Sequence, residues 1–367
     1  MTQVREISTA SGKYPVVIGS GLLRSVPRWL RHLQFSPKAR LLGIVADQSV
    51  AERYAAEVEE ALQEEGYQSV LMTFPSGEDS KSLRQLEGLA TQASQAGLDR
   101  TSLLLTLGGG VAGDLGGFLA AVYMRGLPFV QLPTTLLAHD ASVGGKVGVD
   151  HPLAKNLLGA FWPPKAVLYD VATLRTLSDE EWRNGLGELV KHGLLGDSAL
   201  FEEIVSTAHA LGPKFWRQVS QEQWTVWLAR GIEVKARIVE QDERETGMRR
   251  LLNAGHTVGH AVEWASSYRL RHGEAVSIGL VAESRIALRL GMTSADFVYL
   301  LEASLAACGL PVTIPSDLTV ERLMQAISRD KKKQGSALAM ALPVAVGEVR
   351  IVEQIPIEVV QEVLTYG

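Results

Sequence analysis

The sequence of 367 residues contains a single cysteine, Cys308. One cysteine excludes an internal disulfide and any metal site built from several thiolates. No apolar stretch approaches the ~18 residues that a membrane-spanning helix needs. The segment from Met1 to Val16 carries Arg5, Glu6 and Lys13 and has no apolar core, which excludes a signal peptide. We therefore expect a cytoplasmic protein with no membrane partner.

An excess of positive charge is also absent. The formal net charge is −5, and no basic stripe with interleaved aromatic residues occurs. Such a chain has no field that attracts a polyanion, so nucleic acid is not an expected partner. With 46% hydrophobic and 21% charged residues, the composition is that of an ordinary globular protein. The length allows two domains, because single cores seldom grow beyond ~250–300 residues.

The first half of the sequence alternates short apolar runs with longer amphipathic runs. This alternation is typical of strands and helices in a parallel sheet, and continuously apolar strands indicate a sheet that is covered on both faces. We therefore predict a doubly wound, Rossmann-like α/β domain, whose ligands bind at the carboxyl ends of the strands. The predicted strands are Val16–Ile18, Leu41–Ala46, Ser69–Phe74, Leu103–Leu107 and Phe129–Leu132, and the predicted helices include Ser49–Glu65 and Lys81–Ala96.

The densest glycine cluster, residues 108–117, directly follows one of these strands. Gly108, Gly110 and Gly113 match the pattern G-x-G-x-x-G, in which backbone amides approach a pyrophosphate at a helix N-terminus. The usual fingerprint follows the first strand and has an acid ~20 residues further on, and neither condition holds here. We therefore predict a nucleotide-binding loop of non-standard topology. Tight helix–strand packing explains the last two glycines of the cluster better.

Polar groups follow other predicted strands and fill the loops between them. Asp47 comes directly after a strand, where an acid can accept hydrogen bonds from a ribose diol. Lys146, Lys155 and Asn156 lie in glycine-rich loops and suit a phosphorylated or carboxylated ligand, although a solvated lysine is the commoner case. Beyond about residue 175 the periodicity becomes helical. We therefore predict an α/β domain over residues 1–175 and a mainly α-helical domain over residues 176–367.

Three histidines in the second half suggest a metal site. His256 and His260 are four residues apart, so in a helix both side chains lie on one face and can converge on a metal or an anion. An isolated pair of this kind is more often two satisfied histidines on a half-buried helix. His272 favours the metal, because a catalytic zinc usually takes three protein ligands. Thr257 stands where zinc proteases have a general-base Glu, which disfavours peptide hydrolysis.

The best candidate for a further metal ligand is Glu188, an acid upstream of the histidines. The segment Ser178-Asp179-Glu180-Glu181 is a capping box, and the helix that it starts places Glu188, Lys191 and His192 on one face. Gly185 and Gly187 inside this helix cost ~1 kcal/mol each relative to Ala, which indicates close backbone approach to a neighbour. Alternatively, Glu188 and Lys191 form a surface pair worth only ~0.3 kcal/mol.

A long helix is predicted over Gln221–Glu245, with an inward apolar stripe. Lys235 lies on that stripe. A cation on an apolar face either reaches out to water or meets an anion of the substrate. The sequence alone leaves both possibilities open.

Several motifs then occur in a fixed order between about Asp47 and about Gly347. They are Gly108–Asp114, Met124-Arg125-Gly126, Pro133–Lys146, Lys155-Asn156, Gly187–Lys191, Leu251–His260, His272-Gly273-Glu274 and Asp330-Lys331-Lys332. In this combination the chain closely resembles the 3-dehydroquinate synthases, which belong to the sugar phosphate cyclases. The segment before Asp140 is one residue shorter than in the commoner family form, which leaves the role of His139 open.

The resemblance implies an NAD-binding N-terminal domain, a helical C-terminal domain, a divalent metal (zinc or cobalt) in the cleft between them, and a homodimer. It implies that the metal ligands are Glu188, His256 and His272, and that His260 turns toward the substrate phosphate instead. The implied NAD-binding residues are Asp47, Ser76, Gly77, Glu78, Asp79, Ser80, Lys81, Gly110, Val111, Ala112, Gly113, Asp114, Thr134, Thr135, Lys146, Lys155, Thr173, Leu174, Arg175 and Thr176. The implied substrate-binding and catalytic residues are Asp140, Lys146, Lys155, Asn156, Lys191, Lys235, Arg249, Asn253, His260 and Lys332, with Arg125 from a partner subunit.

The activity that the resemblance implies is a lyase reaction of the shikimate pathway, which converts 3-deoxy-D-arabino-heptulosonate 7-phosphate to 3-dehydroquinate and phosphate. A sister cyclase for a neutral sugar phosphate, such as sedoheptulose 7-phosphate, would leave the cations of Arg249 and Lys235 without an anion. A metal-dependent polyol or alcohol dehydrogenase resembles the chain less around Lys146 and Lys155. The set of candidate ligands argues against a non-catalytic NAD-binding protein.

Overall fold

The structure is a computed structural model that describes residues 1–37, 41–152, 154–334 and 338–366, without the side chains of residues 154, 329–334 and 366. The chain divides into two compact units. Unit 1 comprises Met1–Leu177 and Ser220–Ala229, and unit 2 comprises Ser178–Val219 and Arg230–Gly367. Among the described residues, no helix is both long enough and apolar enough to cross a membrane.

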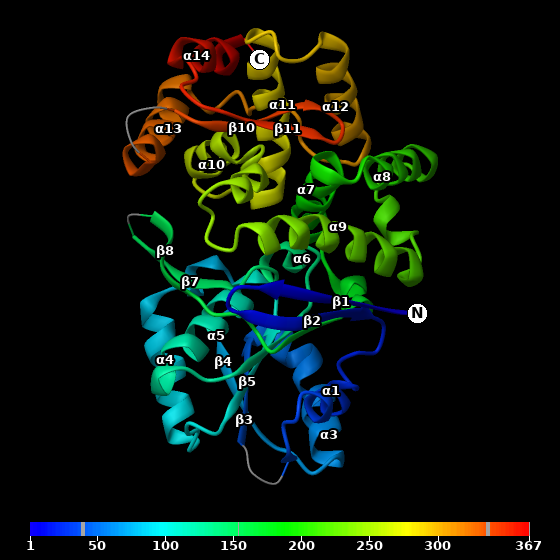
Figure 1. Ribbon diagram of the computed structural model, residues 1–367, viewed down its shortest axis with the longest axis vertical. Coiled ribbons are helices and arrows are strands. Elements are labelled where there is room, and N and C mark those ends of the chain that lie inside the picture. The colour runs from blue at the N-terminus through cyan, green and yellow to red at the C-terminus, as the bar shows by residue number, and fades with distance from the viewer. Residues whose placement is uncertain (38–40, 153, 335–337, 367) are drawn as a thin grey trace. The chain divides into compact units, whose positions relative to one another are not determined.

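Unit 1 is built on a seven-stranded sheet (Figure 1). Its spatial order is β1 (Thr2–Thr9), β2 (Gly12–Gly19), β9 (Ala166–Asp170), β6 (Phe129–Pro133), β5 (Leu103–Gly108), β3 (Leu41–Asp47) and β4 (Gln68–Phe74). Only β1 is antiparallel to its neighbour, and the other pairs are parallel. The five predicted strands are confirmed, whereas β1 and β9 were not predicted.

Helices cover both faces of this sheet, as its continuously apolar strands predicted. On β5, the buried side chains of Leu103, Leu105 and Leu107 pack with residues of α1 (Val26–His32) and α3 (Ala56–Glu64). Leu104 points to the other face and packs with α4 (Leu83–Gln95) and α5 (Gly110–Val122). Figure 1 shows these two helix pairs on opposite sides of β3 and β5. The hairpin of β7 (Lys146–His151) and β8 (Ala154–Phe161), which was not predicted, adds Val147 and Val149 to the α4 and α5 side.

Short elements join the strands of unit 1 to its helices. The predicted helix Ser49–Glu65 is present as three consecutive pieces, whereas the predicted helix Lys81–Ala96 begins later, at Leu83, because the Ser82 hydroxyl caps it. The short elements are α2 (Gln48–Val50), η2 (Ala51–Ala55), η3 (Glu78–Ser80), η4 (Tyr123–Arg125), α6 (Ala138–Ala141) and η5 (Val171–Thr176).

Unit 2 is largely helical, as predicted, with one small hairpin that was not. The predicted cap is confirmed, because the Ser178 hydroxyl accepts a hydrogen bond from Glu181 N at 3.2 Å. A core of buried apolar residues joins the later helices to the hairpin. The elements after residue 177 are α7 (Asp179–Gly196), α8 (Ser198–Leu211), η6 (Phe215–Arg217), α9 (Gln221–Gln241), η7 (Met248–Asn253), α10 (His256–Ala265), α11 (His272–Arg289), α12 (Ala295–Ala307), α13 (Val320–Gln334), β10 (Met340–Ala345), β11 (Glu348–Val352) and α14 (Ile357–Tyr366). The part of α9 up to Ala229 belongs to unit 1 and the rest to unit 2.

Helix α9 ends four residues earlier than predicted, at Gln241. The Asp242 carboxylate accepts hydrogen bonds from the backbone N–H groups of Thr246, Gly247 and Arg249, at 2.9, 2.7 and 3.0 Å. Asp competes with helical hydrogen bonding in this way and favours turns. Burial raises the pKa of this carboxyl, but the three N–H donors outweigh burial and lower the pKa to about 2.

We predict that Asp242→Asn makes the stability of the protein less sensitive to acid. A carboxyl with a depressed folded-state pKa stabilises the fold above its unfolded pKa of ~3.9, and this contribution disappears as the pH falls toward 2. Urea unfolding midpoints at pH 7, 4 and 3 should therefore fall more steeply for the wild type than for the variant. Parallel pH curves would show that the charge of Asp242 does not stabilise the turn.

Candidate active site

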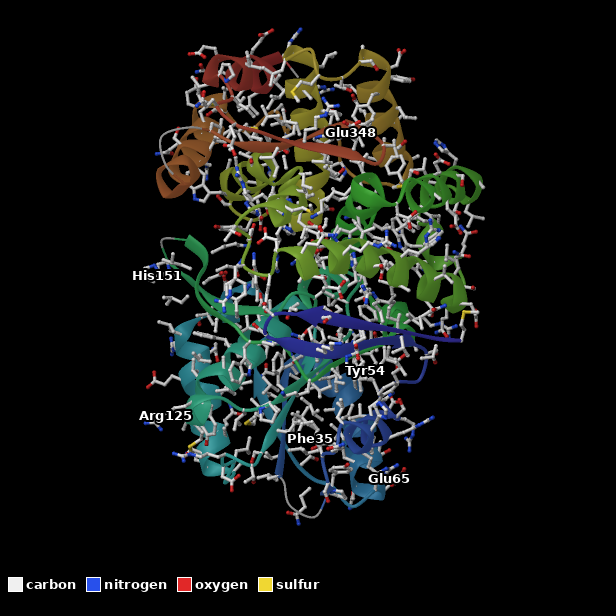
Figure 2. All side chains as sticks on the ribbon, viewed as in Figure 1. Phe35, Tyr54, Glu65, Arg125, His151 and Glu348 are labelled. Carbon is white, nitrogen blue, oxygen red and sulfur yellow. The ribbon has the colours of Figure 1, made fainter. Side chains whose placement is uncertain are left out.

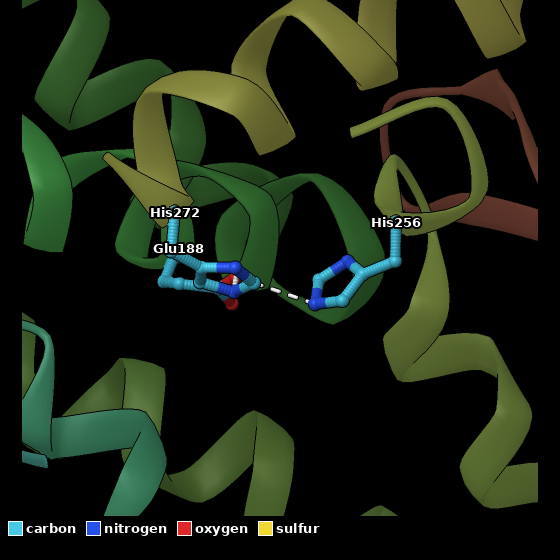
Figure 3. Close-up of side chains that lie close together, drawn as sticks. All are labelled: Glu188, His256 and His272. Atoms are coloured by element: carbon cyan, nitrogen blue, oxygen red, sulfur yellow. Dashed lines mark hydrogen bonds and ion pairs between the residues drawn. The ribbon is translucent and has the colours of Figure 1, made fainter. Parts of the chain in front are cut away.

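Three helices of unit 2 bring Glu188, His256 and His272 together (Figure 3). Glu188 lies in the middle of α7, and the two histidines are the first residues of α10 and α11. Glu188 Oε1 is 3.2 Å from His272 Nε2 and 3.5 Å from His256 Nε2. The ligand atoms of all three residues lie within 4.8 Å of one another.

This donor set fits a divalent metal of the zinc type. Two imidazoles and one carboxylate are ligands that catalytic zinc accepts, with a fourth position for water or substrate. Two donors about 2.0–2.1 Å from a tetrahedral ion lie about 3.3–3.4 Å apart. The distances from Glu188 Oε1 to His272 Nε2 and His256 Nε2, 3.2 and 3.5 Å, bracket this separation.

Glycines let the three helices approach at these ligands. A Cβ built on Gly187, next to Glu188, would lie 2.1 Å from the carbonyl oxygen of Gly273. One on Gly255, next to His256, would lie 2.8 Å from Val276 O, and Gly255 has a φ of +78°. Real Cβ atoms do not come this close to a backbone oxygen, so larger residues would separate α7, α10 and α11. The close approach that Gly187 predicted is confirmed.

The pair Glu188 and Lys191 is buried, so the interpretation as a surface pair is wrong. Their exposed fractions are 0% and 1%, and Lys191 Nζ lies 2.5 Å from Glu188 Oε2. Lys191 also donates to the carbonyl oxygen of Leu252 at 2.8 Å. A buried ion pair of this kind adds little net stability, because removing both charges from water is costly. Because Lys191 holds Oε2, only Oε1 of Glu188 faces the histidines.

The two histidines have opposite protonation tendencies. Burial and the charge of Lys191 lower the pKa of His256 well below its usual range, although Glu188 acts in the other direction. Burial also lowers the pKa of His272, but the hydrogen bonds to Glu188 and Glu263 and their charges outweigh it and raise the pKa to about 10. His256 is therefore neutral and ready to bind a metal, whereas a metal at His272 Nε2 must displace a proton.

Two buried acids near this cluster were not found from the sequence. Glu263 Oε2 is 3.3 Å from His272 Nδ1. Glu283 accepts hydrogen bonds from Gly255 N at 2.6 Å and from Val258 N at 3.0 Å, at the start of α10. Burial raises the pKa of Glu283 to about 8, although these N–H donors lower it. The sequence carried one signal for each acid. Glu263 follows His256 by seven residues, and Glu283 lies within the apolar run of α11.

His260 is exposed and lies outside the three-residue cluster. Its ring centroid is 5.1 Å from that of His256 and 5.8 Å from that of His272. His260, Glu263 and His272 form a second group whose ligand atoms lie within 4.8 Å of one another. A metal in this group would use the Nδ1 side of His272, because Nε2 faces Glu188.

The other candidate substrate residues of unit 2 differ in their surroundings. Lys235 is buried on α9. Arg249 is 3% exposed and donates through Nη1 to the carbonyl oxygen of Glu243 at 2.5 Å. Asn253 donates to Glu245 Oε1 at 2.9 Å. Lys332 belongs to α13, and its side chain lies outside the described residues.

The candidate nucleotide residues of unit 1 follow the carboxyl ends of neighbouring strands. The chain runs from β3 outward to β4 and then returns to β5 on the other side of β3, so the sheet order reverses between β3 and β5. Open α/β sheets bind ligands at such a reversal. A Cβ on Gly108 at the end of β5 would lie 3.5 Å from Asp47 Oδ2 at the end of β3. The acid beside the glycine loop is thus Asp47, which comes before the loop in the sequence, whereas the usual fingerprint has its acid after the loop.

The glycine loop and its surroundings fit a polar ligand. A small pocket at this edge is lined by Thr106, Gln131, Ser142 and the loop glycines. The hydroxyl oxygens of Thr106, Ser142 and Thr134 are buried and have no hydrogen-bond partner among the described residues. Buried polar atoms are normally satisfied. Together with the N-terminus of α5 at Gly110, they suit the hydroxyls and phosphates of a dinucleotide.

Several of these residues already form contacts with one another. Lys81 Nζ lies 2.5 Å from both Asp114 Oδ2 and Asn156 Oδ1. Lys155 Nζ is 3.4 Å from Glu78 Oε1. Ser76 donates to Asp47, Ser80 to Pro75, and Thr173 to Thr134 and Asp170. Thr176 faces the hydroxyl of Tyr54 (Figure 2) at 2.6 Å. Part of the predicted set is therefore joined in several small groups within unit 1.

The candidate residues outside these groups lie on short elements. Asp140 is half-buried in α6, beside the fully buried His139, whose Nδ1 is 2.6 Å from Leu136 O. This contact ties the His139 ring to the backbone three residues earlier. Lys146 is exposed at the start of β7, and Arg125 is exposed after α5 (Figure 2). Arg125 has a φ of +70°, a strained conformation that is often found at functional sites.

Comparison with known protein families identifies the chain. A family model described as 3-dehydroquinate synthase N-terminal matches residues 71–184, and one described as 3-dehydroquinate synthase C-terminal matches residues 185–333. The chain belongs to the 3-dehydroquinate synthase family. A 3-dehydroquinate synthase of Geobacillus thermodenitrificans (strain NG80-2) is 42% identical over 351 residues, which cover 95% of this chain and 94% of that protein.

Solved structures of two other synthases share the fold of this 3-dehydroquinate synthase family member. A 2-epi-5-epi-valiolone synthase from Streptomyces hygroscopicus subsp. jinggangensis 5008, with NAD+ and Zn2+ bound, has a TM-score of 0.86 at 26% identity and covers 96% of each chain. A 2-deoxy-scyllo-inosose synthase complexed with carbaglucose-6-phosphate, NAD+ and Co2+ has a TM-score of 0.87 at 22% identity and covers 100% of each chain.

We predict that Gly187→Ala weakens both the fold and metal binding. The new Cβ must push α7 away from the backbone of α11, which costs about 1–3 kcal/mol, the range for overpacking. Urea unfolding and competition with a chromophoric chelator measure the two effects. Gly88→Ala in α4 is the control, because its Cβ would meet nothing closer than 4.0 Å and should stabilise the helix by about 0.5–1 kcal/mol. If both variants changed the free energy of unfolding and the metal affinity equally, the close contact at Gly187 would not be what holds the site together.

Proposed function

We propose that this protein converts 3-deoxy-D-arabino-heptulosonate 7-phosphate to 3-dehydroquinate and phosphate, as an NAD- and metal-dependent lyase of the shikimate pathway. The observation that carries the proposal is the convergence of Glu188, His256 and His272 beside the buried cation of Lys191, in a chain of the 3-dehydroquinate synthase family.

The two cofactors would bind to different parts of the chain. Residues 1–175 would hold NAD at the carboxyl ends of β3, β4, β5, β6 and β9, and residues 176–367 would hold the metal. The two synthases of known structure, one with NAD+ and Zn2+ bound and one with NAD+ and Co2+, support both cofactors. Zinc and cobalt are both compatible with a site of two imidazoles and one carboxylate.

Bound NAD would take a hydride from a substrate carbinol and later return it, and the metal would polarise the reacting hydroxyl. The protein's own groups prepare this chemistry. Lys191 neutralises Glu188 through Oε2 and leaves Oε1 toward the histidines. Glu245 holds the amide of Asn253 at 2.9 Å, so Asn253 is fixed for contact with substrate. Oxidation of the hydroxyl would acidify the adjacent C–H, and phosphate would leave by elimination. After the hydride has returned, the sugar ring would open and an internal aldol addition would close the carbocycle.

The two anionic ends of the substrate would meet different cations. Lys146, Arg125, His260 and Lys332 would bind the phosphate, which itself can accept the proton during elimination. Arg249 and Lys235 would bind the carboxylate, where a planar guanidinium can form two parallel hydrogen bonds. Both of these side chains are buried, at 3% and 7% exposure. A carboxylate bound by these two cations would favour an acidic substrate over a neutral sugar phosphate.

Two further predictions go with this function. Arg125 would reach the phosphate of a partner subunit in a homodimer, and its exposed position after α5 (Figure 2) is compatible with that role. Asp140, Lys155 and Asn156 would contact the substrate or NAD from unit 1. The homodimer and the cytoplasmic location stay predictions.

Phosphate release by the metal-loaded protein with NAD tests the proposed reaction. We expect release from 3-deoxy-D-arabino-heptulosonate 7-phosphate, no release from sedoheptulose 7-phosphate, and no net NADH. Release from the neutral sugar phosphate would assign the chain to a sister cyclase. Steady NADH formation with polyols would assign it to the dehydrogenases.

We predict that Arg249→Ala weakens use of the carboxylated substrate by ~1.5–3 kcal/mol, the value of hydrogen bonds to charged groups. This corresponds to a loss of about 10- to 150-fold in kcat/KM. Arg250→Ala is the matched control, because the neighbouring Arg250 pairs with Glu353 at 2.8 Å instead. Steady-state kinetics compare the variants. An Arg249 variant with wild-type kcat/KM would exclude this residue from carboxylate binding.

A further inference from the structure

The polar face of α10 extends beyond its two histidines. His256, His260 and Glu263 follow one another at positions i, i+4 and i+7, so they form one stripe along the helix. Glu263 is only 4% exposed. Its carboxylate reaches across to α11, where Oε2 lies 3.3 Å from Nδ1 of His272. Glu263 therefore links the helix of one candidate ligand to the side chain of another.

The ring of His272 lies between two carboxylates that face its two nitrogens. Nε2 is 3.2 Å from Glu188 Oε1, and Nδ1 is 3.3 Å from Glu263 Oε2. A metal-binding imidazole offers the lone pair of one nitrogen and carries its proton on the other. An acceptor at Nδ1 keeps the proton there and leaves Nε2 for the metal.

His256 shows the same arrangement with a different acceptor. Its Nδ1 is 3.1 Å from the carbonyl oxygen of Ala254, and its Nε2 faces Glu188. In both rings Nδ1 is therefore directed at an acceptor and Nε2 at the same carboxylate oxygen. Because the acceptor of His272 is a side chain, its contribution can be removed by substitution.

We propose that Glu263 is a positioning residue that keeps the His272 proton on Nδ1 and directs Nε2 toward the metal. This inference rests on the ligand set proposed above. A carboxylate is costly to bury without a donor or a cation, and the N–H of His272 supplies such a donor. Loss of a metal-site partner of this kind typically weakens metal binding by about 10- to 100-fold.

The test is the affinity of the protein for Zn2+ or Co2+, measured in the absence of substrate by competition with a chromophoric chelator. Glu263→Ala should bind metal about 10- to 100-fold more weakly than the wild type. Glu263→Gln retains an acceptor oxygen and should lose less. Glu302→Gln is the matched control in the same unit, because Glu302 pairs with Arg285 at 2.9 Å, and its affinity should equal that of the wild type.

A second set of variants separates this role from direct ligation. If Glu263 instead binds a metal together with His260 and His272, His260→Ala should weaken binding as much as Glu263→Ala. We expect His260→Ala to leave the affinity unchanged, and a matching loss would overturn the inference. An affinity of Glu263→Ala within twofold of the wild type would also overturn it.

The outcome for His272→Ala distinguishes this inference from the proposed ligand set. Wild-type metal affinity in His272→Ala would contradict the ligand set itself. Weak binding in His272→Ala with normal binding in Glu263→Ala would leave the ligand set intact and contradict only the inference.

A spectroscopic measurement covers the case in which Glu263→Ala does not fold. Long-range proton–nitrogen NMR of the zinc-loaded protein, labelled with 15N-histidine, reports which ring nitrogen carries the proton. The wild type should show His272 protonated at Nδ1, and Glu263→Gln should broaden or shift this signal. The same His272 spectrum in both proteins would show that the carboxylate of Glu263 only packs against the ring.

Discussion

The backbone contact between α7, α10 and α11 is the constraint on which the proposed metal site depends. Gly187 meets Gly273, and Gly255 meets the backbone at Val276, at separations that exclude any Cβ. Each of these glycines is adjacent in sequence to a candidate ligand. Glu188 and His272 are 84 residues apart in the chain, and only this packing places their donor atoms at 3.2 Å. The positions of the three candidate ligands thus depend on the absence of a Cβ at these glycines as much as on the ligand residues themselves.

Buried charge is the cost of this arrangement, and neighbouring groups compensate for it. Lys191 pairs with one oxygen of Glu188, and Glu263 lies against the second nitrogen of His272. Glu283 accepts two backbone N–H groups at the start of α10, which fixes the turn that carries His256. These contacts hold the candidate ligands from several elements, and preorganisation of this kind limits reorganisation during catalysis.

The sequence was most informative where the signal is local. Apolar runs located five strands of the sheet, and Ser178 located the start of α7. The strands of the β7–β8 and β10–β11 hairpins were missed, although β10 lies in the apolar run of residues 338–346 and Gly347 follows it. The end of α9 was also missed, because Asp242 stops the helix through hydrogen bonds to residues several positions ahead.

The candidate site was predictable only in part. Periodicity joined His256 to His260, whereas the structure groups His256 with Glu188 and His272. Only the family resemblance anticipated that set. Likewise, Asp47 lies beside Gly108 because β3 and β5 are neighbours in the sheet, which sequence order does not reveal. Glu263 and Glu283 contact residues of other elements, so their spacing along their own helices does not reveal their partners.

A crystal structure of the zinc-loaded protein, with anomalous scattering data collected on both sides of the zinc edge, tests the central claim most directly. The account predicts one strong anomalous peak about 2.0–2.2 Å from Glu188 Oε1, His256 Nε2 and His272 Nε2. A peak bound by His260 and Glu263 on the Nδ1 side of His272, or no ordered peak in unit 2, would contradict it.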